Sequence, residues 1–260
     1  MQAPVNVICM KWGKLYGPEY VNHLREGVGR HLKRPFRFVC FTDDAQGLRD
    51  DVQVLSLPQL SLPKGQGDLR WRKLAVFREQ LHDLQGSTLF LDLDLVIVDG
   101  LDAFFEHPGR FLIIRDDDLF RPKPLRKLNP ARDRFKATVG NSSVFRFEIG
   151  AHSDLLDAYM ANPTLAACAY KNEQEFLTSH LAAQGVVQYW PRAWCVSFKN
   201  DCVPRGLVSY RRDPAVPPYA KIVVFAGTPK MSDVLVGGGQ TWYRRIGDVD
   251  WLRRAWSGTT

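Results

Sequence analysis

The chain has 260 residues, of which 45% are hydrophobic and 12% aromatic, a composition that supplies a core and excludes an intrinsically disordered protein. A formal charge of +7 favours an anionic ligand or surface, such as a nucleotide, a nucleic acid or an acidic lipid, and does not choose among them. No signal-peptide pattern opens the chain and no apolar run reaches the ~18 residues of a membrane-spanning helix, so we expect a soluble, cytoplasmic protein.

The cysteines are odd in number and spread widely along the chain. This indicates reduced thiols that pack as small apolar side chains, and it argues against a disulfide framework or a zinc site. No stretch rich in glycine, serine or proline divides the chain, so we expect a single domain over residues 1–260. The cysteines are Cys9, Cys40, Cys168, Cys195 and Cys202.

The start of the chain predicts a strand, a helix and a second strand. Residues 5–10 and 36–41 are short β-type runs, and residues 19–32 carry apolar side chains at helical spacing. This order implies a right-handed parallel βαβ unit. Ligands of open parallel sheets collect at the carboxyl ends of the strands, where the loops after Met10 and Phe41 are expected.

A further strand over residues 52–55 and a loop over residues 57–67 lead to a predicted helix over residues 68–84, with Asp68 as its N-cap. The apolar residues Leu74, Phe77, Leu81 and Leu84 would share one face of this helix. Its first turn contains three cations, which is unfavourable for the helix dipole and indicates a nearby anion. The alternative is a solvated basic face. These cations are Arg70, Arg72 and Lys73.

The apolar run over residues 89–98 has two carboxylates in its middle and predicts a strand buried on both faces. Residues i and i+2 of a strand point the same way, so Asp92 and Asp94 would lie side by side. Two like charges tolerate burial when a hard divalent cation with oxygen ligands sits between them. We therefore predict a metal-bound phosphate site at the end of a central strand. The alternative is two solvated aspartates in a loop at a fraying strand end.

The second half of the chain alternates strands and helices. Residues 116–136 are charged and aperiodic, and we expect them to form a functional flap. Residues 140–143 read as a turn before a strand over 144–147, although such polar residues could also contact sugar hydroxyls. Predicted helices cover 101–105, 153–160 and 172–181, the last capped by Asn172 with Glu173 and Glu175 as favourable first-turn charges, and predicted strands cover 110–115, 186–190 and 221–225.

The tail over residues 241–256 mixes tryptophan and arginine. We interpret it as a helix docked on the domain, with contact to a membrane surface as the alternative.

Several motifs, in this order and spacing, resemble the nucleotide-sugar glycosyltransferases of the GT-A fold, especially the glycogenin-like branch of family 8 and related bacterial proteins. The resemblance covers most of the chain, although each motif by itself is weak. The motifs are residues 11–13 with 20–22, 41–44, 71–74, 90–94, 140–144, 173–175 and 225–230.

The resemblance implies an α/β fold of the GT-A type, with a mixed, mostly parallel central sheet flanked by helices. Residues 1–100 would form the nucleotide-binding half and residues 101–260 the acceptor-side half. Asp92 and Asp94 resemble the ligands of a Mn²⁺ or Mg²⁺ ion, and Asp92 would also lie near the ribose. The other implied contacts are Tyr16 or Tyr20 with Asp43 or Asp44 for the base, Lys73 or Arg72 and Lys230 for phosphate, and Asn141, Ser142, Glu173 and Gln174 for sugar and acceptor.

One position departs from the family pattern. A histidine near the last strand usually supplies a third metal ligand, and this chain has Ala226 in that region. The metal would then be held by two carboxylates, the diphosphate and water, or activity would be reduced.

The resemblance implies a metal-dependent transferase that moves a hexose from a nucleoside-diphosphate sugar, expected to be a UDP-sugar, to an unidentified hydroxyl acceptor. The acceptor could be a glycan, a lipid-linked sugar or a small molecule, and no nucleic acid is expected as a partner. A first alternative is a phosphatase of the haloacid-dehalogenase type with Asp92 as nucleophile and Asp94 as acid/base. A second is a non-enzymatic basic module that binds an anionic surface.

Overall fold

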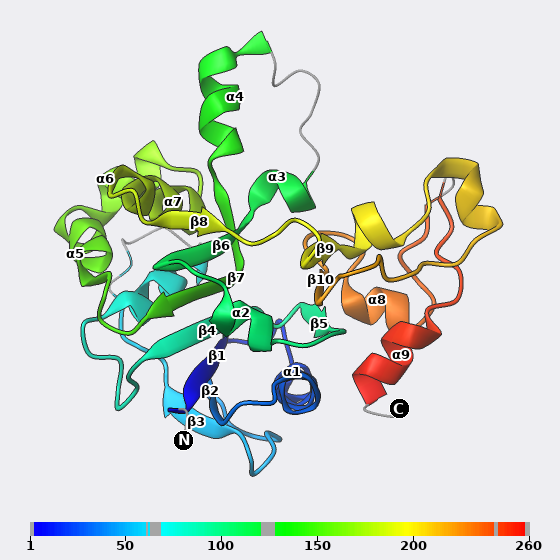
Figure 1. Ribbon diagram of the computed structural model, residues 1–260, viewed down its shortest axis with the longest axis horizontal. Coiled ribbons are helices and arrows are strands. Elements are labelled where there is room, and N and C mark those ends of the chain that lie inside the picture. Colours follow the sequence, from blue (N-terminus) through cyan, green and yellow to red (C-terminus); the bar gives the residue numbers. More distant parts are fainter. Residues whose placement is uncertain (1–2, 61, 63–68, 121–127, 242–243, 258–260) are drawn as a thin grey trace.

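The computed structural model describes residues 3–60, 62, 69–120, 128–241 and 244–257. Its centre is a seven-stranded sheet with the strand order β3-β2-β1-β4-β7-β6-β8, and a second sheet has the order β5-β10-β9 (Figure 1). The larger sheet consists of β1 Val5–Lys11, β2 Phe36–Thr42, β3 Gln53–Ser56, β4 Ser87–Leu91, β6 Phe111–Arg115, β7 Gly140–Glu148 and β8 Val187–Tyr189. The smaller sheet consists of β5 Leu95–Ile97, β9 Cys195–Ser197 and β10 Ile222–Val224.

The larger sheet is mixed and mostly parallel, as the resemblance implied. Strand β1 pairs in parallel with β2 and β4, and β2 with β3, whereas β7 runs antiparallel between β4 and β6. Since β4 and β6 both oppose β7, they run in the same direction. The carboxyl ends of β1, β2, β4 and β6 and the amino end of β7 therefore meet at one edge of the sheet.

Alternate residues of the central strands enter separate cores on the two faces of the sheet. Val7 and Cys9 of β1 pack with α1 (Pro18–His31) and α2 (Asp102–Glu106). Ile8 and Met10 pack instead with α5 (Ser153–Ala161), α7 (Glu173–Ala183) and the 3₁₀ helix η1 (Leu69–Phe77). A third core joins the smaller sheet to α8 (Met231–Leu235) and α9 (Asp250–Ser257).

The remaining helices are short. They are α3 Asp116–Leu119, α4 Pro130–Ala137, α6 Pro163–Ala169, the π-helix η3 Phe198–Cys202 and the 3₁₀ helix η4 Gly206–Tyr210. All five cysteines are free thiols, and four of them are buried, as expected; Cys168 is exposed. Within the described ranges, no helix has the length and apolar character needed to cross a membrane.

The prediction of one continuous acidic strand over residues 89–98 is wrong. Strand β4 ends at Leu91, and β5 begins at Leu95 in the other sheet. The backbone N–H of Asp92 still donates to Ser143 O of β7 at 2.9 Å, and the carbonyl of Asp94 already accepts from Phe225 N after β10 at 2.8 Å. The two aspartates therefore occupy the crossing between the two sheets.

The predicted helix over residues 68–84 is also wrong in type and length. The described segment is a 3₁₀ helix that ends at Phe77, and Asp68 lies outside the described residues. Residues 73–77 are buried without a break because the segment packs between the sheet and helices α5 and α7. A segment without a solvent face does not need the 3.6-residue amphipathic pattern. Leu81 and Leu84 are nevertheless buried.

Three further predictions are corrected in the second half. Residues 116–136 contain α3 and most of α4 and are not one aperiodic loop, while 121–127 lie outside the described residues. Asn129 caps α4 by accepting from Arg132 N at 3.1 Å, with Pro130 in the first turn. Residues 140–143 form the buried start of β7 and not a turn. In the tail, helix α9 covers only Asp250–Ser257, and 242–243 lie outside the described residues.

Candidate functional site

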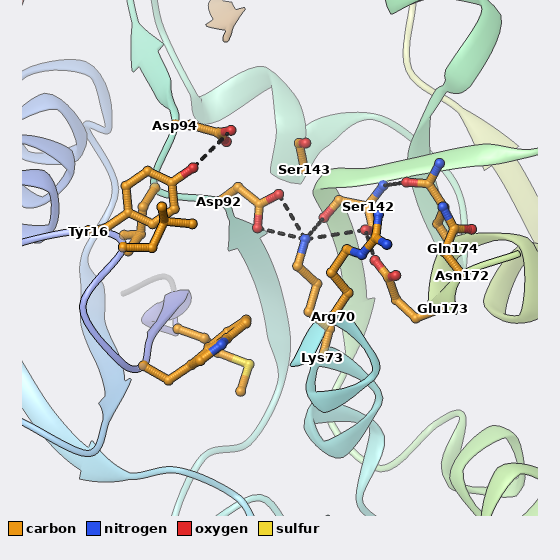
Figure 2. Close-up of a pocket in the computed structure, with 14 residues that line it drawn as sticks. Tyr16, Arg70, Lys73, Asp92, Asp94, Ser142, Ser143, Asn172, Glu173 and Gln174 are labelled. Atoms are coloured by element: carbon orange, nitrogen blue, oxygen red, sulfur yellow. Dashed lines mark hydrogen bonds and ion pairs between the residues drawn. The ribbon is translucent and has the colours of Figure 1, made fainter. Parts of the chain in front are cut away.

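A cavity of about 290 Å³ lies at the edge of the larger sheet where the carboxyl ends of β1 and β4 meet the amino end of β7. The crossing segment after β4 supplies two of its carboxylates, and η1 and the first turn of α7 supply the facing side chains (Figure 2). Its polar and aromatic lining consists of Trp12, Tyr16, Arg70, Lys73, Asp92, Asp94, Ser142, Ser143, Asn172, Glu173 and Gln174.

Lys73 is the central cation of the cavity. Its Nζ lies 2.7 and 2.8 Å from the two carboxylate oxygens of Asp92 and donates to the carbonyl and hydroxyl oxygens of Ser142, each at 3.3 Å. Burial by itself lowers the pKa of Lys73, but the charges of Asp92 and Glu173 outweigh that effect and raise it. Lys73 therefore remains an ammonium ion at neutral pH and neutralises Asp92.

Asp94 is the less compensated carboxylate. Burial and the neighbouring charge of Asp92 raise its pKa to about 6, against the opposing effect of Lys73 and Lys230. The Tyr16 hydroxyl donates to Asp94 Oδ2 at 3.3 Å. Burial and the charge of Asp94 also raise the pKa of Tyr16, so the phenol stays protonated as a donor. Figure 2 shows Asp92 turned toward Lys73 and Asp94 turned toward Tyr16.

The two glutamates at the start of α7 have different environments. Glu173 Oε1 accepts from Ser142 Oγ at 2.9 Å, and within the described part of the chain its buried Oε2 has no hydrogen-bond partner. Burial raises the pKa of Glu173, although Lys73 opposes this. Glu175 is instead ion-paired with Lys136 of α4 and does not line the cavity. The structure therefore brings Glu173, and not Glu175, to the site.

An acid that the sequence analysis did not single out holds the amides near Glu173. Asp116 Oδ1 accepts from Asn141 Nδ2 and from Gln174 Nε2, both at 3.2 Å. Asp116 directly follows β6, whose carboxyl end lies at the same edge of the sheet as that of β4. Its position directly after a predicted strand is the available signal, although the charged, aperiodic pattern of residues 116–136 predicts a flap. Gln174 Oε1 in turn accepts from Ser142 N at 3.5 Å, so both ends of the amide are fixed.

Of the candidate contacts to the nucleotide base, one lines the cavity and the others lie beside it. Tyr16 lines the cavity. Tyr20 packs edge-on against the rings of Tyr16 and Trp256, with distances of 4.9 and 5.1 Å between ring centres. Asp43 accepts from Gly13 N at 3.2 Å, and the carbonyl of Asp44 accepts from Lys11 Nζ at 3.1 Å. Both acids are thus at the correct edge of the sheet without lining the cavity.

The candidate phosphate contacts divide in the same way. Arg70, which precedes Lys73 by one turn of η1, lines the cavity, whereas Arg72 does not. Lys230 does not line it either, but its Nζ lies 5.8 Å from the centre of the Tyr16 ring and its charge acts on Asp94. The structure therefore brings three cations, Arg70, Lys73 and Lys230, to the acidic pair.

The carboxylates can contribute to a divalent cation site but do not complete one. Among the described residues, no group of three or more His, Cys, Asp or Glu side chains could hold a metal ion. Asp92 and Asp94 supply hard oxygen donors, and a cation would offset the burial and the neighbouring charge of Asp92 that raise the pKa of Asp94. Asp92 already has both oxygens on Lys73. Asp94 is thus the better placed of the two ligands, and phosphate oxygens or water would complete the set.

Comparisons with solved structures identify the fold. No family model and no curated protein matches the sequence. Among solved structures, the galactosyltransferase LgtC in complex with donor and acceptor sugar analogs is 10% identical, with a TM-score of 0.58 over 98% of this chain and 96% of that chain. An active-site mutant of LgtC is 11% identical, with a TM-score of 0.60 over the same shares of 98% and 96%.

A third similar structure is the bifunctional glycosyltransferase WbbM without ligands. It is 11% identical with a TM-score of 0.58, and the match covers 89% of this chain but 47% of that longer chain. Likeness at this identity establishes the fold. The GT-A fold implied by the sequence motifs is therefore confirmed.

Proposed function

We propose that this GT-A-fold chain is a glycosyltransferase that moves a hexose from a nucleoside-diphosphate sugar, with UDP as the expected nucleotide, to a hydroxyl acceptor. The observation that carries the proposal is one cavity at the carboxyl edge of the central strands that combines paired carboxylates, a buried lysine and a buried glutamate with an oriented glutamine. The solved LgtC structure with donor and acceptor sugar analogs has the same fold. Five free cysteines suit the reducing cytoplasm.

The acidic side of the cavity would take the donor diphosphate. We infer that Asp94, assisted by Asp92, holds a Mn²⁺ or Mg²⁺ ion, which when bound offsets the charge of the leaving diphosphate. Arg70, which lines the cavity, and Lys230, whose charge acts on Asp94, add positive charge near the acidic pair. Tyr16 lines the cavity next to Asp94 and offers its ring to the nucleotide.

The opposite side of the cavity would take the sugar and the acceptor. The buried Oε2 of Glu173 has no hydrogen-bond partner among the described residues, so it can accept from a hydroxyl of the sugar or the acceptor. Gln174 and Asn141 are held by Asp116 and Ser142, so their amides are preorganised and not free to rotate. The resemblance leans toward retention of the anomeric configuration.

The phosphatase alternative is not supported by the position of its nucleophile. Asp92 follows β4, in the middle of a seven-stranded sheet of GT-A type, and both of its oxygens are engaged by Lys73. A carboxylate paired in this way is a weaker nucleophile.

Isothermal titration with UDP, with and without Mn²⁺, tests the proposal. We expect binding that needs Mn²⁺ and is lost in Asp94→Ala. The matched control is Asp157→Ala, which removes an exposed aspartate of α5 outside the site. The proposal is wrong if no nucleoside diphosphate binds in the presence of Mn²⁺, or if Asp94→Ala binds as well as the control.

A further inference from the structure

The chain between β9 and β10 carries an apolar tip that the candidate site does not use. Residues 203–214 form a loop whose two ends lie next to each other, since Ala215 N donates to Cys202 O at 3.1 Å. The base of this loop is firmly held, because Cys202 and Val203 belong to the third core and the Trp251 indole donates to Pro214 O at 3.0 Å. A compact surface loop with adjoining ends on a packed base is often functional.

The tip of this loop is the 3₁₀ helix η4, and its geometry forces apolar side chains outward. Ser209 is buried, and its hydroxyl donates to Gly206 O at 2.7 Å and accepts from Arg245 N at 2.9 Å. A 3₁₀ helix has three residues per turn. With Ser209 facing inward, Leu207 and Tyr210 share one outer face and Val208 occupies the next. Leu207 is 82% exposed, Val208 50% and Tyr210 48%.

Arginines surround these apolar side chains. Arg205, Arg211 and Arg212 flank η4 in sequence, and Arg245 is brought beside it by the hydrogen bond to Ser209. All four are exposed, and the described residues offer their side chains no hydrogen bond or ion pair. Asp213 is the acid of the loop, and it accepts from Asp248 N at 2.9 Å. Exposed cations around an apolar tip complement a surface that has an outer layer of negative charge and an apolar layer beneath it.

The tail that the sequence analysis considered for membrane contact has a different environment. The ring centre of Trp256 in α9 lies 5.1 Å from that of Tyr20 and 3.8 Å from that of His23. The indole of Trp251 donates to Pro214 O. Helix α9 is therefore docked on the domain, as the first interpretation predicted. Trp251 and Trp256 are therefore engaged in contacts within the domain, whereas Leu207 and Val208 of η4 are exposed.

We propose that Leu207, Val208 and Tyr210, with Arg205, Arg211, Arg212 and Arg245, form a membrane-docking tip that binds the surface of an anionic phospholipid bilayer. The apolar side chains enter the headgroup region, and the arginines bind lipid phosphates. In Figure 1 this gold segment forms the outer end of the C-terminal part of the molecule. Such binding would hold the proposed transferase at a surface where lipid-linked acceptors are found, but it requires no glycosyl transfer.

Co-sedimentation with vesicles made of equal parts phosphatidylglycerol and phosphatidylcholine tests the tip without nucleotide or acceptor. We expect the full chain to bind these vesicles, to release them at high salt, and not to bind pure phosphatidylcholine. The Leu207→Asp/Val208→Asp variant and the Arg211→Ala/Arg212→Ala variant should each lose about tenfold or more in binding. An unchanged circular dichroism spectrum and an unchanged melting temperature would show that both variants are folded.

Matched controls remove the same kinds of side chain elsewhere. Leu165→Asp changes a leucine of α6 that is 63% exposed, and Lys33→Ala/Arg110→Ala removes two exposed cations distant in sequence from the tip. Both should bind vesicles like the unmodified chain. The proposal is overturned if anionic vesicles are not bound, or if the tip variants bind as the controls do. A dimer abolished by Leu207→Asp/Val208→Asp would assign the tip to a second copy of the chain and would also overturn it.

Discussion

Replacing Lys73 by methionine tests whether the cavity depends on a buried ion pair. The side chains of Lys73 and Asp92 are 11% and 23% exposed, so the substitution leaves a mostly buried carboxylate without its partner. Removing one member of a buried pair costs about 3–5 kcal/mol, and the partial access of Asp92 to the cavity favours the lower value. We expect Lys73→Met to lower the free energy of unfolding by about 3 kcal/mol.

A double-mutant cycle separates the pair from general packing. Asp92→Asn should cost about 2 kcal/mol, because Lys73 keeps Glu173 as a partner charge. The double variant should cost about 3 kcal/mol, less than the sum, which gives a coupling energy of about 2 kcal/mol. Urea unfolding of the four proteins at neutral pH measures each term.

The ion pair between Lys221 and Asp99, whose carboxylate is exposed, is the control for this cycle. Its N–O distance is 3.2 Å, and the Lys221 and Asp99 side chains are 17% and 59% exposed. Since Asp99 stays solvated when its partner is removed, Lys221→Met should cost less than about 1 kcal/mol. If the Lys73 and Asp92 substitutions are additive, or if Lys73→Met costs no more than Lys221→Met, the ion pair does not organise the cavity.

Three other predictions follow from the same geometry. In Lys73→Met, Asp92 is released for a cation, so Mn²⁺ should raise the melting temperature more than in the unmodified protein; an equal or smaller rise would separate Asp92 from any metal site. The pKa of Asp94 is raised to about 6, so the folded state holds this proton more tightly than the unfolded state and loses stability as pH rises from about 4 to 6. Asp94→Asn should therefore stabilise the protein at pH ~7 by about 2 kcal/mol in urea unfolding, with little change at pH ~4. An Asn variant less stable at neutral pH would contradict the destabilisation of the Asp94 carboxylate by burial and by the charge of Asp92. Arg146 of β7 donates to the carbonyls of Phe104, His107 and Gly109 at 2.6–2.8 Å, the first of these bonds buried and the other two partly buried. Arg146→Leu should therefore cost about 3 kcal/mol by leaving these acceptors unpaired, and a loss below about 1 kcal/mol in the same assay would show that water replaces the guanidinium.

The parallel start of the fold was predictable because its signals are local. Strand β1, helix α1 and strand β2 each have an uninterrupted periodicity of their own, bounded by turn residues such as Gly17, Pro18 and Pro35. Asn172 was likewise predictable as the cap of α7, because a capping asparagine followed by acids acts through its own backbone neighbours, and it accepts from Glu175 N at 3.2 Å.

The failures occur where tertiary contacts decide the conformation. An apolar run does not reveal that its two ends join different sheets, so the break between Leu91 and Leu95 had no local signal. Residues 140–143 have the polar composition of a turn, but in the structure they complete β7, and Asn141 and Ser142 bond to Asp116 and Glu173. Polar residues in a buried strand are unfavourable for folding unless they are paired, which is the pattern of a functional site.

The change of sheet after Leu91 gives the acidic pair its chemical properties. In one continuous strand, Asp92 and Asp94 would be enclosed by the packing on the faces of the larger sheet and would need full compensation within the core. At the crossing, the backbone of Asp92 is held by Ser143 of β7 and that of Asp94 by Phe225 after β10, so no backbone group is lost. The carboxylates are then fixed at a cavity with unequal compensation, since Lys73 neutralises Asp92 while the pKa of Asp94 stays raised. A cation that binds here would therefore stabilise the charged form of Asp94, and it could also bind Asp92 if that carboxylate leaves its ion pair with Lys73.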